Sequence, residues 1–319
     1  MVKLFRALFV LIVLLVIAGL MIVNFYGDPD VPDATLVAKY APSPPSQFID
    51  LPSGAHVHFR DQGVAGAPVL VLLHGSAASL HTWEPWVQIL GQEFRIITVD
   101  LPSHGLTGAV PSNDYSQAGM ANFVDEFTTT LHVPRFAIGG NSMGGGIAAR
   151  FTLMYPGRVT KLILIDAGGG IQPKAPTDPG IGLRIARMPV LQNIMLYVTP
   201  RGLYEEGLRK AFYDKTLVTA EMVDRYWELN RRPGNRAATL KRFQSVQDTF
   251  VADHVSEIKV PTLILWGDKD TLVPMDAGEG YRDAIKGSQF ILYHDVGHIP
   301  MEEVAARSAE AVRGFLERP

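Results

Sequence analysis

The hydrophobic pattern beyond residue 47 alternates short, fully apolar runs with longer segments of mixed polarity. VLVLLH (69–74), FRIITVD (94–100) and KLILID (161–166) are apolar at consecutive positions, which is typical of strands buried on both faces of a sheet. Apolar strands that alternate with helices predict an α/β fold with a mostly parallel central sheet, helices on both faces and right-handed crossovers. The other expected elements are a hairpin of QFIDL and HVHFR around Pro-Ser-Gly, helices over 81–90, 115–131, 142–155, 274–286 and 302–317, and strands within 135–140, 261–270 and 289–295.

The alternation stops between residues 170 and 252. This stretch contains helix-like segments such as GIGLRIARMPVLQNIMLYV and AEMVDRYWELNRR, punctuated by Pro and Gly, and no convincing buried strand. Helices inserted between two sheet strands predict a cap over the C-terminal edge of the strands, where open α/β sheets bind ligands. We therefore expect a core of residues 47–169 and 253–319 and a helical cap of residues 170–252.

The N-terminal segment has a different pattern. Ala7–Val23 reads ALFVLIVLLVIAGLMIV without a charge, and Lys3 and Arg6 precede it. A helix of this length reaches about 25 Å, and its flanking residues can complete the roughly 30 Å needed to span a bilayer core. We therefore predict one transmembrane helix within a membrane anchor of residues 1–26. Since basic residues precede it and acidic residues follow, the rest of the chain is expected on the non-cytoplasmic side, the periplasmic face of the inner membrane in a Gram-negative bacterium.

Two alternatives to an anchor are weaker. A cleaved signal peptide would carry a small-x-small motif after the apolar run, and none follows. A core helix that is apolar all round is unexpected at an extreme terminus, directly before a proline-rich stretch. That stretch, GDPDVPDATLVAKYAPSPPS (27–46), has five prolines and predicts a semi-stiff spacer between the membrane and the folded domain.

Composition removes several functional classes. The net charge is −3 and no basic stripe is visible, so we expect no nucleic-acid partner. The chain has no cysteine, which removes disulfides, thiol chemistry and cysteine-ligated metals together. No G-x-G-x-x-G opens the first strand–helix unit and no G-x-x-x-x-G-K-S/T occurs, so neither a dinucleotide loop nor a P-loop is expected.

The sequence GNSMG (140–144) lies between an expected strand and an expected helix and matches the G-x-S-x-G of a nucleophile elbow. In so sharp a turn, side chains two residues before and two residues after Ser142 would collide, and Gly140 and Gly144 remove them. The strain holds the Ser142 hydroxyl out over the sheet edge at a helix N-terminus. The pentapeptide also arises by chance, so its placement between strand and helix carries the inference.

A serine hydroxyl is a poor nucleophile without a base, and nine histidines are available. His298, in HDVGHIPMEE, follows the last expected strand and should lie at the same sheet edge as Ser142. His294 belongs to that strand, whose pleat fixes its side chain. We expect the other candidates to be exposed (His56 and His58) or structural (His74 and His104).

The base in turn needs an acid, and the chain order of a nucleophile elbow enzyme is Ser, acid, His. WGDKD follows an expected strand and offers Asp268 and Asp270. We favour Asp270, which lies deeper in the loop, while Asp268 can cap the turn. Asp166, at the end of the preceding strand, is a third option and the most typical of a structural aspartate.

Acyl transfer also requires hydrogen-bond donors for the oxyanion. One is the backbone N–H of Met143, the residue after the nucleophile. The other should come from the loop after the strand that ends at His74, where HGS (74–76) makes the N–H of Ser76 the natural donor.

At these residues the chain strongly resembles the α/β-hydrolase fold superfamily. HGS, DLPSHG, GNSMGGG, WGDKD followed by VP, and GHIPMEE occur in the order of that superfamily, and the resemblance covers roughly residues 47–317. The lipase and carboxylesterase branch, some of whose members carry an N-terminal membrane anchor, is similar through the cap stretch YDKTLVTAEMVDRYWELNRRPGNRAA (213–238). The carbon–carbon hydrolases of aromatic ring-fission products are also similar. That branch usually has tryptophan where this chain has Ile299, and it uses a cap arginine to which Arg225 corresponds only approximately.

The resulting hypothesis is a serine hydrolase of carboxylic esters that works through Ser142, His298 and Asp270, forms an acyl-enzyme and needs no metal or organic cofactor. Apolar residues in 185–198 and the nearby membrane favour hydrophobic or lipid-like esters. A carbon–carbon bond hydrolase of the meta-cleavage type and a non-catalytic small-ligand sensor remain alternatives. The sequence makes no prediction of the oligomeric state.

Overall fold

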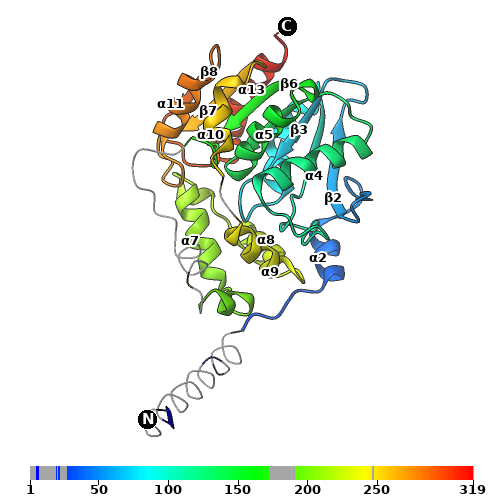
Figure 1. The fold of residues 1–319 in the computed structure, drawn as a ribbon, viewed down its shortest axis with the longest axis vertical. Helices are drawn as coiled ribbons and strands as arrows, with labels where there is room; N and C mark the ends of the chain where they lie inside the picture. The colour runs from blue at the N-terminus through cyan, green and yellow to red at the C-terminus, as the bar shows by residue number, and fades with distance from the viewer. Residues whose placement is uncertain are drawn as a thin grey trace.

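A computed structural model describes residues 27–171, 191–245 and 248–318, together with residues 5, 6, 19, 21 and 188. Its centre is an eight-stranded sheet in the order β1-β2-β4-β3-β5-β6-β7-β8 (Figure 1). Strands β3 to β8 run parallel, and β2 is antiparallel to both β1 and β4. The mostly parallel sheet that the apolar runs predict is therefore confirmed. The strands are β1 (Ser46–Asp50), β2 (His56–Gly63), β3 (Val69–Leu73), β4 (Arg95–Val99), β5 (Phe136–Asn141), β6 (Val159–Ile165), β7 (Thr262–Gly267) and β8 (Gln289–Tyr293).

Helices cover both faces of this sheet. The buried side chains of α4 (Gln117–Thr130), α5 (Met143–Met154) and α11 (Met275–Ala284) share one hydrophobic cluster with the strands. Those of α3 (Glu84–Leu90) and α13 (Ala305–Leu316) share a second cluster on the other face. Because both faces are covered, the central strands are apolar at consecutive positions, which explains why short uninterrupted apolar runs mark them in the sequence.

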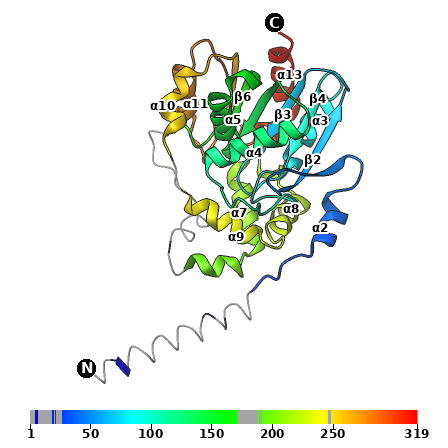
Figure 2. The same cartoon turned by 45° about the vertical axis from the view of Figure 1, so that its right-hand side comes forward.

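Between β6 and β7 the chain forms helices, which we call the insert. Within residues 191–245 and 248–261, which the structure describes, the insert contains no strand. In both views α7, α8 and α9 lie together at one end of the sheet (Figures 1 and 2). This agrees with the predicted helical character, while the limits of a cap at residues 170 and 252 stay a prediction. The insert consists of η3 (Leu191–Leu196), α7 (Arg201–Ala211), η4 (Lys215–Leu217), α8 (Ala220–Asn230), α9 (Asn235–Gln244), α10 (Phe250–His254) and η5 (Val255–Glu257).

The predicted transmembrane segment, Ala7–Val23, lies outside the described residues except for positions 19 and 21. Among the residues that the structure describes, no helix combines the length and the apolar character needed to cross a bilayer. The membrane anchor of residues 1–26 therefore stays a prediction.

The spacer predicted for residues 27–46 is corrected by the structure. Residues Asp33–Tyr40 form helix α2 (Figure 2). Leu36 of this helix is fully buried and packs in one cluster with Leu106 and Leu229. The five prolines lie before or after this helix and none interrupts it, because proline is tolerated where a backbone N–H needs no helical partner. The number of prolines therefore led to the prediction of a spacer, and the short helix between them, which packs on the folded domain, was not predicted.

Candidate active site

Ser142 lies at the turn between β5 and α5, where the sequence places a nucleophile elbow. Its φ of 53° and ψ of −120° are strained for a residue with a side chain. A Cβ atom on Gly140 would collide with the carbonyl of Gly144, and one on Gly144 would collide with the carbonyl of Leu73. The two glycines are therefore required by close backbone contacts, as the motif indicates.

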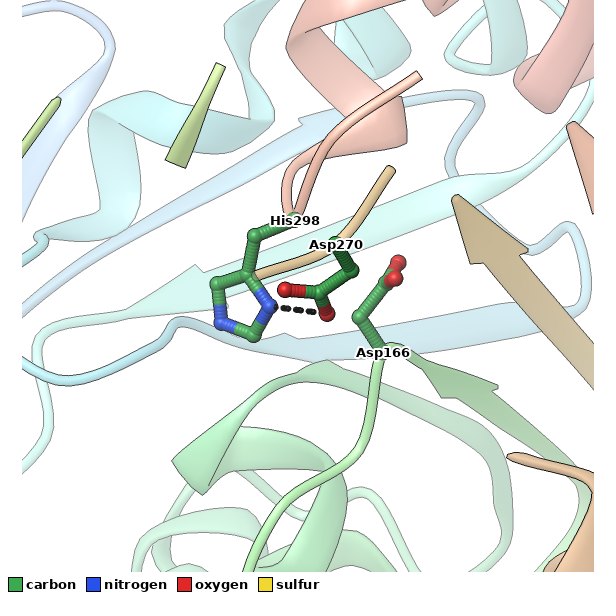
Figure 3. Close-up of side chains that lie close together, drawn as sticks. All are labelled: Asp166, Asp270 and His298. Atoms are coloured by element: carbon green, nitrogen blue, oxygen red, sulfur yellow. Dashed lines mark hydrogen bonds and ion pairs between the residues drawn. The ribbon is translucent and has the colours of Figure 1, made fainter. Parts of the chain in front are cut away.

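His298 and Asp270 meet at the same edge of the sheet (Figure 3). His298 follows β8 and Asp270 follows β7, and His298 Nδ1 lies 2.6 Å from Asp270 Oδ2. The two side chains are 7% and 0% exposed, so water hardly competes for this hydrogen bond. Asn141 holds the histidine loop in place, because its Nδ2 donates a 2.9 Å hydrogen bond to the His298 carbonyl.

Backbone N–H groups of its own loop fix the Asp270 carboxylate in position. Its Oδ1 accepts hydrogen bonds from the backbone N–H groups of Leu272 at 2.7 Å and Val273 at 3.0 Å. A carboxylate can only accept, so His298 must carry its proton on Nδ1 and is left with Nε2 as a hydrogen-bond acceptor. That is the tautomer which a base for a serine hydroxyl requires.

Asp166 lies behind Asp270, on the side away from His298 (Figure 3). Its Oδ1 accepts a hydrogen bond from the N–H of Gly267 at 3.0 Å, and its Oδ2 is buried without a hydrogen-bond partner among the described residues. Burial and then the charge of Asp270 raise the pKa of Asp166 well above its ordinary value. Asp166 therefore retains a proton to higher pH than an ordinary carboxyl group, in keeping with a structural aspartate.

The carboxyl groups of Asp166 and Asp270 and the ring of His298 offer ligand atoms within 4.8 Å of one another. Asp166 Oδ1 already accepts the N–H of Gly267, and His298 Nδ1 already bonds Asp270 Oδ2, so these ligand atoms are occupied. Among the described residues, this cluster is better suited to a series of hydrogen bonds than to a metal centre.

The neighbouring candidates Asp268 and His294 lie at the surface turn beyond β7 and β8. Asp268 Oδ1 accepts the N–H of Asp295 at 2.8 Å, and its Oδ2 lies 3.2 Å from Nδ1 of His294, whose side chain is exposed. Asp268 therefore caps a turn, as one reading of WGDKD expects, and His294 points to solvent.

The prediction for His58 was wrong. His56 is exposed, but His58 is fully buried, and its Nδ1 lies 2.7 Å from Asp100 Oδ2. The physical reason is that β2 is an inner strand of the sheet, with β1 on one edge and β4 on the other. The sequence of the hairpin gives no sign of β4, the second strand that pairs with β2.

His74 and His104 are buried, as expected for structural histidines. His74 Nδ1 donates to the Gly75 carbonyl at 2.8 Å, and its Nε2 accepts the N–H of Leu101 at 3.0 Å. Burial lowers the pKa of both histidines, so both stay neutral at neutral pH.

The predicted oxyanion donors belong to segments that flank Ser142. Met143 begins α5, and the loop with Ser76 packs against the elbow, because a Cβ atom on Gly75 would lie 2.9 Å from Asn141 Oδ1. Ser76, Ser142 and His298 line one cavity of about 670 Å³. The structure therefore brings all five sequence-predicted site residues to one place.

Most of the residues that line the cavity come from the insert, and the surface of the whole cavity is mostly apolar, with Met195, Leu203, Leu240 and Phe243 among the apolar members. Arg242 also faces this cavity and was missed by sequence reasoning, because nothing local distinguishes it from the other arginines of the insert. Arg225 instead lines a separate recess with Lys39, Tyr40 and Glu84.

The strained serine elbow at the carboxyl edge of a mostly parallel sheet, beside a buried His–Asp pair, defines an α/β hydrolase. Residues 68–304 match the alpha/beta hydrolase fold family, and the chain belongs to that family. The resemblance stated from the motifs is thus confirmed at the level of the superfamily.

Three similar proteins show how varied the relatives are. The chain is 30% identical over 271 residues to the 2-hydroxy-6-oxononadienedioate/2-hydroxy-6-oxononatrienedioate hydrolase of Escherichia coli (strain K12), covering 82% of this chain and 91% of that protein. A bacterial membrane phospholipase A superposes with a TM-score of 0.75 at 24% identity, over 98% of each chain. A putative lipase from Acinetobacter baumannii AYE superposes with a TM-score of 0.72 at 25% identity, over 91% of this chain and 97% of that one.

Proposed function

We propose that this hydrolase is a serine esterase that cleaves carboxylic esters through Ser142, His298 and Asp270. The observation that carries the proposal is the strained Ser142 on the wall of the same cavity as His298, whose Nδ1 is occupied by a buried carboxylate. This arrangement leaves His298 Nε2 as the acceptor for a proton at the wall of a mostly apolar cavity.

The chemistry follows from these positions. His298 Nε2 takes the Ser142 hydroxyl proton as Oγ attacks the ester carbonyl carbon, and Asp270 stabilises the imidazolium that forms. The N–H groups of Ser76 and Met143 hold the oxyanion. The bond to the alcohol breaks as His298 returns the proton to the alcohol oxygen. Water, deprotonated by His298, then hydrolyses the acyl-enzyme and restores the Ser142 hydroxyl.

Hydrophobic or lipid-like esters are the substrates that we propose. The surface of the cavity as a whole is mostly apolar, and the predicted anchor of residues 1–26 would keep the domain at a membrane, on its non-cytoplasmic side. A membrane phospholipase A and a putative lipase among the similar structures are in keeping with this choice.

A carbon–carbon bond hydrolase is the second candidate, favoured by the 30% identity to the Escherichia coli 2-hydroxy-6-oxo acid hydrolase. Two features make the carbon–carbon hydrolase a less favoured candidate than the esterase. Ile299 stands beside His298 where that branch usually has tryptophan, and Arg225 lines a recess other than the cavity of Ser142. A non-catalytic sensor with an intact triad is the third candidate.

The test measures release of 4-nitrophenol by the full chain from 4-nitrophenyl esters of graded acyl length. We expect rapid release that Ser142→Ala lowers by at least about 10³-fold, since removing the nucleophile of a triad removes most of the catalysis. Ser53→Ala, at an exposed turn between β1 and β2, is the matched control and should keep wild-type activity.

Negligible release by folded wild-type protein would reject the esterase proposal. Cleavage of a 2-hydroxy-6-oxo-dienoate, followed by loss of its absorbance, would then support the carbon–carbon hydrolase. Binding without turnover of either substrate would support a sensor.

A further inference from the structure

Arg242 places a guanidinium group beside the proposed oxyanion donors. It lies in the last turn of α9 and faces the cavity that Ser142 lines. Its Nη2 donates a 2.8 Å hydrogen bond to Ser76 Oγ, and its Nη1 lies 3.5 Å from Met143 Sδ. The charge therefore sits against both residues whose backbone N–H groups would hold the oxyanion.

The other cations of the cavity wall are already neutralised by carboxylates. Arg236 pairs with Asp30 at 2.6 Å, and Lys210 pairs with Glu206 at 3.0 Å. Within the described part of the chain, the polar partners of the Arg242 guanidinium are Ser76 Oγ and Met143 Sδ and include no carboxylate, and its buried Nε has no hydrogen-bond partner there. Burial lowers the pKa of Arg242 to about 10, which leaves the guanidinium charged at neutral pH.

The Arg242 side chain is half-buried, and a cation that is partly withdrawn from water without a counter-ion loses hydration free energy that no ion pair replaces. A ligand with a negative charge would offset this unfavourable free energy, because a charge-assisted hydrogen bond in a partly buried site is stronger than a neutral one. A guanidinium fork matches the two oxygens of a carboxylate, and one unpaired cation balances one such group.

We propose that Arg242 binds a carboxylate carried by the ester substrate, close to the scissile carbonyl. The inference rests on the proposed esterase function and narrows its substrates to acidic esters with an otherwise apolar body. The apolar wall of the insert holds the body, and Arg242 selects the ester whose charge lies beside the reacting centre.

The experiment compares charged esters with neutral twins on the full chain. The acyl side is probed by mono-4-nitrophenyl adipate against its methyl ester. The alcohol side is probed by 4-butyryloxy-3-nitrobenzoate against its methyl ester. The readout is the ratio of kcat/KM for the charged ester to kcat/KM for its neutral twin, so that any general loss of activity cancels.

We expect wild-type protein to prefer the charged member of at least one pair, which identifies the side of the ester that bears the carboxylate. Arg242→Gln should lower that ratio by about 10- to 100-fold, as expected for loss of a hydrogen bond to a charged group. Arg242→Lys should lose less, because it keeps the charge. Lys241→Gln, which removes the adjacent exposed charge bound to Asn113, should leave the ratio unchanged.

If Arg242→Gln lowers kcat/KM equally for charged and neutral esters, the arginine only supports the Ser76 loop. That result would overturn the inference and leave the esterase proposal standing. No turnover of any ester by wild type would overturn the esterase instead. Calorimetric binding of adipate to Ser142→Ala then tests the carboxylate site by itself: the site stands if adding Arg242→Gln abolishes binding, and it falls if adipate does not bind or binds equally well with and without Arg242→Gln.

Discussion

At the scale of single residues, hydrogen bonds around His298 distinguish the aspartates that could serve as its partner. Asp270 accepts two backbone N–H groups in addition to its hydrogen bond with the imidazole of His298. Asp166 accepts one N–H group, and burial followed by the charge of Asp270 raises its pKa well above its ordinary value. Asp268 is engaged in a surface turn. Of the three aspartates, only Asp270 is hydrogen-bonded to His298.

We therefore expect Asp270→Asn to lower kcat for a neutral 4-nitrophenyl ester by about 10⁴-fold, because an amide no longer selects the productive tautomer of His298. Asp268→Asn is the matched control and should stay within about threefold of wild type. Circular dichroism checks that each variant is folded. Nearly full activity of Asp270→Asn, together with its loss in Asp166→Asn, would contradict the assignment.

At the scale of elements, α2 and the residues before it attach the N-terminal part of the chain to the insert. Leu36 packs on Leu229 of α8, and Lys39 and Tyr40 both bond Glu228 of the same helix. Upstream, Asp30 pairs with Arg236 of α9. These contacts hold α8 and α9, which enclose the cavity, to a segment far away in the sequence.

Leu36→Ala should lower the free energy of unfolding by about 2–5 kcal/mol, since it opens a cavity at a fully buried site. Thr35→Ala, on the exposed side of α2, should change it by no more than about 0.5 kcal/mol. Urea unfolding measures both values, and hydrogen exchange over residues 33–40 and 220–244 locates the loosened region. Equal stability and equal exchange in the two variants would show that the docking of α2 is energetically unimportant.

At the scale of the whole molecule, three histidines of the segments after β3 and β4, namely His74, His81 and His104, are buried in the folded domain. Burial lowers the pKa of His74 and His104, and lowers the pKa of His81 to about 4. In the unfolded chain the pKa of each of these histidines is about 6.5. Below that pH the unfolded state binds more protons than the folded state, so stability falls as the pH falls.

The free energy of unfolding should therefore decrease between about pH 6.5 and pH 4, by up to about 1.4 kcal/mol per pH unit for each of these histidines. Urea unfolding at a series of pH values measures this slope. His104→Asn should make the slope shallower, whereas His56→Asn, at an exposed position, should not alter it. Stability that stays flat from pH 7.5 to pH 4.5 would contradict the prediction.

The sequence by itself determined the order of the elements and the meeting of Ser142, Asp270 and His298. Strands buried on both faces leave uninterrupted apolar runs, so β3, β6 and β7 are visible locally. Residues that follow parallel strands meet at one edge of the sheet, which is why three separate motifs could be assigned to one site.

Only the tertiary structure decided what lies beside these elements. His58 is buried because β2 gains β4 as a second neighbour, α2 is stable because α8 covers Leu36, and Arg242 faces the cavity because of the way α9 packs. Each of these outcomes depends on a contact between segments far apart in the chain. The local hydrophobic pattern does not predict such a partner, because the same helix or hairpin can pack in several ways.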